Sequence, residues 1–153
     1  MAPMWPFKRK SPTPDHLPVD GPWALAEGEH NGGTMIIRTN TGYRDFKIVP
    51  GYEYQVGIAV PLRNPEVTGL PGAAEGAVLG EIEDTICSSL EEQVESLLVA
   101  VITTGGMREF VFYTRQPHRV EERVVKLRER ITSHEIQLVI QSDRDWEIYA
   151  QLG

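Results

Sequence analysis

LLVAVITTGGMREFVFY, residues Leu97–Tyr113, consists of two apolar runs rich in β-branched and aromatic residues, which meet at Gly105-Gly106. Two adjacent glycines in this position are typical of a two-residue type I′ turn, because both central residues of that turn need a positive φ. The stretch is therefore predicted to form a β-hairpin. With the turn at the two glycines, Val101 is expected to face Phe110.

This register sorts the side chains of the hairpin onto two faces, since neighbours along a strand alternate. Both faces are apolar, and two helices would cover only one of them. The other face needs a cover of its own, which an N-terminal hairpin, a C-terminal segment with Trp146 and Tyr149, or a second subunit could provide. The first face is predicted to hold Val99, Val101, Phe110 and Phe112, and the second Leu98, Ala100, Ile102, Val111 and Tyr113.

Periodicity assigns the elements on either side of the hairpin. Helical spacing predicts helices from 73 to about 93 and from 117 to 131, and a short closing helix near 143–149. Alternation predicts strands over 23–27, 34–39, 54–60 and 134–141, with Asn31-Gly32-Gly33 as the turn between the first two.

The order from residue 54 to 141 is thus β-α-β-β-α-β, which predicts an α+β fold with a ferredoxin-like antiparallel sheet and both helices on one face. An N-terminal β-hairpin is expected to extend or cover that sheet. Residues 22–153 are predicted to be a single α+β domain after a proline-rich, disordered leader, residues 1–21. Each helix should bury one stripe: Val78, Leu79, Ile82, Ile86 and Leu90 in the first, and Val120, Val124, Leu127 and Ile131 in the second.

Composition limits the classes of partner and the location. The net charge of −7 opposes the electrostatic attraction that dominates nucleic-acid binding, which argues against nucleic acid as a partner. Cys87 is the one cysteine, so an internal disulfide is excluded and a reducing, cytoplasmic location is expected. Residues 4–10 place aromatic beside basic side chains, which suits a peripheral contact with an anionic membrane surface; the alternative is a solvated tail.

The acidic residues are concentrated in one segment. Between Asn64 and Met107 the chain has eight Asp and Glu residues and no Lys or Arg. The helix in this segment is predicted to present an acidic face that binds a protein partner with a basic surface; the alternative is a solvated helix face. The residues of this predicted face are Glu81, Asp84, Glu91 and Glu92.

A second candidate site consists of Arg38, Asn40 and Arg44, together with Arg108 at the end of the central hairpin. Arginines beside an amide can bind a carboxylate or phosphate through forked hydrogen bonds. The alternative is a structural ion pair of these arginines, for example with Glu53 or Glu109.

Two further patterns have a structural and a functional interpretation. Asp143-x-Asp145 has the residue types of a cation site but too few oxygen ligands, and N-capping of the closing helix is the preferred interpretation. The glycines before and within the first long helix lie where a phosphate-binding loop would be. They match no phosphate-binding motif, so Gly76 and Gly80 are expected to allow close helix packing instead.

Several segments taken in order resemble the bacterial family called "domain of unknown function 695". They are AEGEHNGGTMIIRTNTGYRDF, VGIAVPL, EIEDTI, VITTGGMREFVFYT and HEIQLVIQSDRDWEIY, and the resemblance runs from about residue 23 to 152. The family name implies no established activity, so the resemblance supplies no catalytic residues, metal or cofactor.

The function expected from these observations is a non-catalytic binding or regulatory module for a protein partner or a small ligand, with a homodimer as a further expectation. The alternative is an enzyme with a dispersed site around Arg38, Asn40 and Arg44. A deep pocket with convergent polar groups would favour the enzyme, and a flat apolar or acidic face would favour the module.

Overall fold

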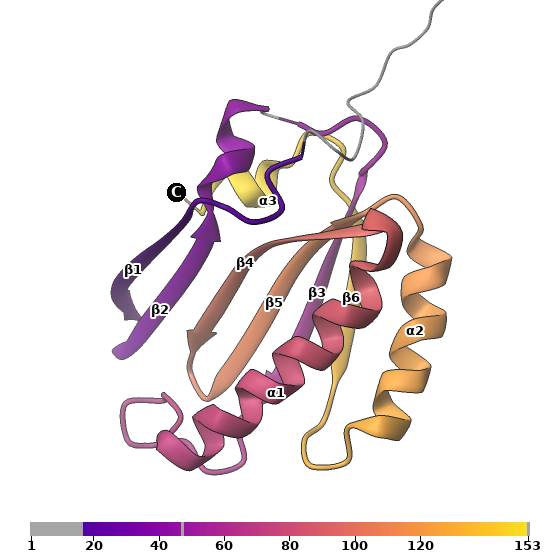
Figure 1. Cartoon of the computed structure of the whole chain (residues 1–153). Helices are drawn as coiled ribbons and strands as arrows, with labels where there is room; N and C mark the ends of the chain where they lie inside the picture. The colour runs from indigo at the N-terminus through magenta and orange to yellow at the C-terminus, as the bar shows by residue number, and fades with distance from the viewer. Residues whose placement is uncertain (1–16, 47, 153) are drawn as a thin grey trace, which may run out of the picture.

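The computed structural model describes residues 17–46 and 48–152, which form an antiparallel sheet with helices on both faces (Figure 1). The strands lie in the order β1-β2-β4-β5-β3-β6. The strands are β1 (Trp23–His30), β2 (Gly33–Asn40), β3 (Tyr54–Pro61), β4 (Ser96–Thr104), β5 (Met107–Thr114) and β6 (Gln137–Ser142). The helices are η3 (Thr41–Asp45), α1 (Ala73–Leu90), η4 (Glu92–Val94), α2 (Pro117–Arg130) and α3 (Glu147–Ala150).

The structure confirms the α+β class, and the sheet has six strands. Helices α1 and α2 lie side by side on one face, whereas η3 and α3 lie near one end of the other face (Figure 1). Strands β6, β3, β5 and β4 form a continuous block, and the β1–β2 hairpin extends the sheet beyond β4. The six-stranded order therefore differs from the four-stranded order of a ferredoxin-like sheet, because the β1–β2 hairpin adds two strands at one edge.

The central hairpin has the predicted turn and register near that turn. Gly105 and Gly106 have φ of 60° and 77°, and Val101 pairs with Phe110. The first hairpin is built in the same way, because Asn31 and Gly32 also have positive φ, 53° and 81°. Both turns use residues that tolerate the left-handed region.

The predicted faces of β4 are wrong at two residues. Leu98 pairs with Phe112 but Ala100 pairs with Val111, so a β-bulge at Val99 shifts the register. Beyond the bulge the side chains exchange faces, as one extra residue requires. Leu98 therefore lies in the core under the helices, and Val99 lies on the opposite face.

The helix-covered core consists of the apolar stripes of α1 and α2 packed on the middle of the sheet. α2 buries Val120, Val124 and Leu127, as predicted. α1 buries four of its five predicted residues, but Val78 is 36% exposed, so its assignment to the stripe is wrong. The packing role predicted for Gly76 and Gly80 is also wrong, since a Cβ at either position would meet no atom within 4 Å.

The other sheet face is covered at one end by a second, largely aromatic core. The Trp146 ring stacks on Tyr113 with a centroid distance of 4.0 Å, and its Nε1 donates to Tyr52 O at 2.8 Å. Tyr43 of η3 and Tyr149 of α3 complete the ring cluster. The cover thus comes from two remote segments of the same chain, of which the sequence indicated only the C-terminal one.

The start of the described chain also joins this second core. Leu17 is 7% exposed and packs with the aromatic cluster, and Pro18 O accepts a hydrogen bond from Asn40 Nδ2 at 2.7 Å. Residues 1–16 of the predicted leader, including the stretch 4–10 proposed to contact a membrane, lie outside the described residues.

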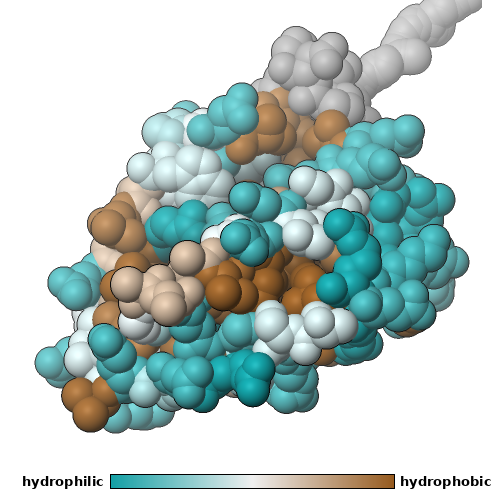
Figure 2. Space-filling view, turned by 60° about the horizontal axis from the view of Figure 1, so that its bottom comes forward, coloured by the Kyte–Doolittle hydropathy of each residue, from teal (hydrophilic) through white to brown (hydrophobic). Residues whose placement is uncertain are grey.

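The surface shown in Figure 2 is mostly hydrophilic, with hydrophobic residues gathered near the middle of the face presented there. Among the described residues, no helix has the length and apolar character needed to cross a membrane.

Candidate functional site

A small pocket lies on the helix-covered face of the sheet, next to β1 and β2. Cross-strand pairing builds it from two neighbouring rows of residues. Leu70 and Pro71, just before α1, also line the pocket, which has a volume of about 220 Å³. The first row is Leu25, Arg38 and Val101, and the second is Ile36, Thr103 and Arg108.

The pocket brings together two of the four ligand-binding candidates, Arg38 and Arg108. Arg38 makes a forked ion pair with Glu83 of α1, with Nη2 to Oε1 at 2.6 Å and Nη1 to Oε2 at 3.2 Å. Glu83 therefore takes the place of Glu53 and Glu109, the partners suggested by the sequence. The pair joins β2 to α1 across one side of the pocket.

Arg108 is half-buried, and one of its guanidinium nitrogens is bound by the protein. Its Nε donates to Thr103 Oγ1 at 2.9 Å, and among the described residues its terminal nitrogens have no acceptor. Burial and then the neighbouring Arg38 lower the pKa of Arg108, whereas Glu83 opposes the shift. The guanidinium nevertheless stays charged at neutral pH. Two guanidinium groups and one carboxylate leave an excess of one positive charge among apolar walls.

Asn40 and Arg44 do not belong to this pocket. Asn40 is fully buried; its Nδ2 donates to Pro18 O, and its Oδ1 accepts from Gly42 N at 2.9 Å. Both side-chain atoms thus hold backbone in place at the start of η3. Arg44 is exposed on η3, which packs over the other face of the sheet. The structure therefore does not bring Arg38, Asn40 and Arg44 to one point.

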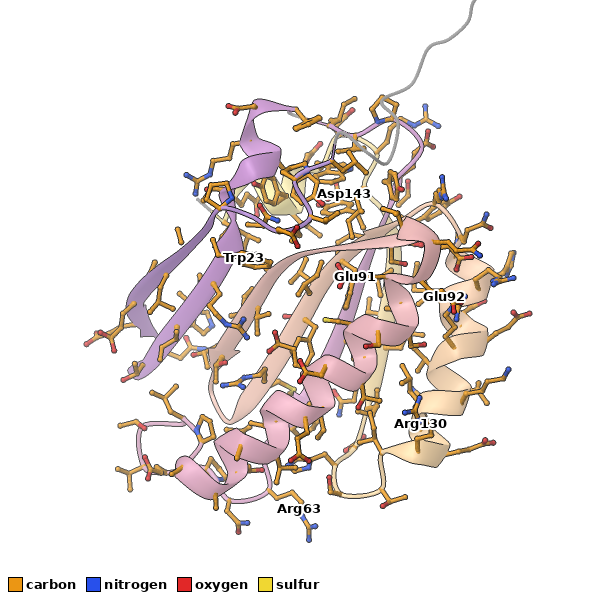
Figure 3. All side chains as sticks on the ribbon, viewed as in Figure 1. Trp23, Arg63, Glu91, Glu92, Arg130 and Asp143 are labelled. Atoms are coloured by element: carbon orange, nitrogen blue, oxygen red, sulfur yellow. The ribbon has the colours of Figure 1, made fainter. Side chains whose placement is uncertain are left out.

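The predicted acidic face of α1 divides into paired and solvated residues. Glu92 Oε1 accepts from Arg123 Nη2 of α2 at 2.8 Å, and Figure 3 labels Glu91 and Glu92 at the C-terminal end of α1. Burial raises the pKa of Glu91, whose Oε2 accepts from Leu98 N at 3.3 Å. Glu81 and Asp84 are exposed on α1, and Glu92 is exposed just beyond its end.

An acidic residue that the sequence did not single out, Glu75, connects three segments. Its carboxylate accepts from the backbone nitrogens of Arg63 at 2.6 Å and Asn64 at 3.0 Å, and bonds His134 Nε2 at 2.7 Å. The side chains of Glu75 and His134 are 8% and 4% exposed. This cluster fixes the start of α1. Its one sequence signal was an acid in the first helical turn.

Asp143 caps the first amides of α3, in line with the preferred interpretation of Asp143-x-Asp145, although it lies three residues before the N-cap position, Trp146. Its Oδ1 accepts from Glu147 N at 2.9 Å, and its Oδ2 from Ile148 N at 3.0 Å. In the part of the chain that the structure describes, no group of three or more His, Cys, Asp and Glu side chains is arranged to hold a metal ion.

Fold and site together define an α+β protein with an extended antiparallel sheet and a small apolar-walled pocket that contains two arginines. The chain belongs to the family described as "Family of unknown function (DUF695)", which matches residues 22–152 and confirms the resemblance. A search of curated proteins found no match. A search of solved structures found none either.

Proposed function

We propose that the protein is a non-catalytic binding module that holds a small carboxylate with a short apolar chain in the pocket between Arg38 and Arg108. The observation that carries this proposal is the half-buried guanidinium of Arg108, whose terminal nitrogens have no acceptor among the described residues. A planar, forked donor of this kind matches the two oxygens of a carboxylate. Glu83 already neutralises Arg38, so a ligand carboxylate would balance the remaining charge.

The walls and size of the pocket restrict the rest of the ligand. Leu25, Ile36, Leu70 and Val101 provide apolar surface around the two arginines. The volume of about 220 Å³ lies below the roughly 300–1,000 Å³ of sites for drug-sized molecules, which favours a short chain. The enzyme alternative around Arg38, Asn40 and Arg44 gains no support, because the side-chain hydrogen bonds of Asn40 go to the backbone.

The proposal is tested by titrating the full chain with 3-methylbutanoate and with its neutral counterpart, 3-methylbutanamide, while recording backbone amide shifts by NMR. We expect saturable shifts around Ile36, Leu70 and Val101 with the carboxylate only. Arg108→Gln should weaken binding by about tenfold or more, the usual effect of losing a charge-assisted hydrogen bond.

Arg44→Gln is the matched control, since Arg44 is an exposed arginine on the other side of the sheet. It should leave binding unchanged. Equal binding of the amide, shifts centred elsewhere, an unaltered affinity in Arg108→Gln, or no binding of 3-methylbutanoate and butanoate would each overturn the proposal.

We also infer that residues 54–142 form a ferredoxin-like unit. The adjacent order β6-β3-β5-β4 and the two long helices on one face support this assignment. The bacterial cytoplasm is the proposed location. It is supported by the one cysteine, Cys87, which leaves the chain without an internal disulfide.

A further inference from the structure

Among the described residues, the cover of the sheet face opposite α1 and α2 lies at one end only. η3 and α3 pack over the residues near Ala100 and Val111, and Figure 1 shows both helices at that end of the sheet. The neighbouring cross-strand row lies toward the central turn, away from α3. Pairing places Ala26, Ile37, Ile102, Glu109, Ala59 and Gln137 side by side in this row.

We call this surface the open sheet patch and define it by Met35, Ile37, Ala59, Ile102, Met107 and Glu109. All six residues are half-buried rather than buried. At the β6 edge, Val139 is 59% exposed on the same side as Gly57. In the part of the chain that the structure describes, no layer lies over this apolar patch, whereas two helices pack on the other face of the sheet.

Glu109 is the one charged residue of the six, and its neighbours across the strands are Ile102 and Ala59. Among the described residues its carboxylate has no hydrogen-bond or ion-pair partner. Gly57 provides the space in which it lies, because a Cβ at Gly57 would come within 2.7 Å of Glu109 Oε2. An unpaired carboxylate on an apolar sheet face is complementary to a partner that places a cation among apolar side chains.

We propose that the open sheet patch docks an amphipathic helix of a partner protein, with a lysine or arginine of that helix paired to Glu109. A helix laid on the patch would give the second sheet face the layer that α1 and α2 give the first. Its cation would supply the missing partner of Glu109. The net charge of −7 also favours a basic partner during approach.

The same geometry argues against a second copy of this chain as the occupant. In a two-fold symmetric dimer the same patch meets itself. The two Glu109 carboxylates would then approach each other in an apolar interface, which like charges disfavour. A heterologous partner avoids this repulsion.

The test uses a display library of 18-residue amphipathic helices, in which the apolar face is varied among Leu, Ile and Ala and one central position of that face is fully randomised. Selection is carried out on the full chain. Bound clones should carry Lys or Arg at the randomised position. Replacing that residue by Glu in a selected peptide should weaken binding by about tenfold or more.

Variants of the chain locate the contact. Glu109→Gln should remove the preference for a cation, and Glu109→Lys should reverse it toward Glu. Ile37→Ser should weaken the binding of every selected peptide. Arg108→Gln, at the neighbouring residue on the opposite sheet face, should leave peptide binding unchanged although it weakens carboxylate binding, which separates this proposal from the carboxylate pocket.

Circular dichroism confirms folding of each variant before the titrations. Peptides without a cation preference, peptides that bind Ile37→Ser and Glu109→Lys as well as the wild type, or a library that yields no binder would each overturn the proposal. A dimer in light scattering that Ile37→Ser dissociates would assign the patch to a second copy and would also overturn it.

Discussion

Asp143→Ala should destabilise the second core well beyond the usual effect of a surface substitution. The carboxylate of Asp143 accepts hydrogen bonds from Glu147 N and Ile148 N at the start of α3, and from the Tyr113 hydroxyl at 2.6 Å. The same hydroxyl accepts from Tyr149 N at 3.1 Å. One side chain therefore holds α3 against β5.

The magnitude follows from the bonds lost. Removing an N-cap acceptor costs roughly 0.5–2 kcal/mol, and a hydrogen bond to a charged group contributes about 1.5–3 kcal/mol. Asp143 is partly accessible to water, which compensates part of the loss, so we expect about 2–3 kcal/mol. For a domain of this size this corresponds to a fall in Tm of roughly 5–10 °C.

Urea unfolding followed by tryptophan fluorescence measures this effect, since Trp146 lies in the affected core. Asp145→Ala is the matched control, because Asp145 is exposed and belongs to the same short motif; it should change stability by about 0.5 kcal/mol or less. A double-mutant cycle with Tyr113→Phe should give a coupling of about 1 kcal/mol. Equal effects of Asp143→Ala and Asp145→Ala, or a coupling of zero, would refute the reasoning.

Burial acts to raise the pKa of Glu75, but hydrogen bonds from Arg63 N, His134 and Asn64 N lower it overall. Glu75→Gln should therefore reduce stability at pH 7, and the difference should shrink as the pH falls below about 4, as urea titrations at several pH values will show. Burial raises the pKa of Glu109, so the pH dependence of stability has the opposite direction at this residue. The folded state loses stability as the pH rises above about 4.3. The stability of Glu109→Gln relative to the wild type should therefore increase between pH 4 and pH 7. A loss at pH 7 would contradict this assignment. Gly69→Ala should cost about 1–2 kcal/mol more than the control Gly51→Ala: both have positive φ, but only at Gly69 would a Cβ meet backbone, 3.3 Å from the Gly105 and Gly106 nitrogens. Equal losses for the two variants in urea would show that this close approach adds no strain.

The parts of the fold that were predictable from the sequence depend on local chemistry. The paired glycines of the central turn and the two kinds of periodicity specify the hairpin and the order of the strands and long helices. The bulge at Val99 had no such signal. Residues 97–102 are all apolar, so a shift of one residue leaves the pattern unchanged although it moves Leu98 and Val99 to opposite faces.

The candidate pocket was predictable only in part. Arg38 and Arg108 were identified by residue type, but their meeting depends on β2 pairing with β4, a contact between distant segments. The partner of Arg38, Glu83, is 45 residues away in the sequence. The role of Asn40 could not be predicted from its residue type, because a buried asparagine that holds the backbone looks the same in sequence as one that binds a ligand.

Because the second core includes Trp146 and Tyr149, it is completed only after the central hairpin and the long helices have been synthesised. Both strands of the central hairpin and α1 and α2 are made before Trp146 and Tyr149 leave the ribosome. Until then the sheet face that carries Val111 and Tyr113 lacks these two rings of its cover, and this nascent stage is where aggregation competes with folding. The rings that complete the domain are thus translated after the strands that they cover, and ribosome pausing just before them prolongs the vulnerable state of the domain.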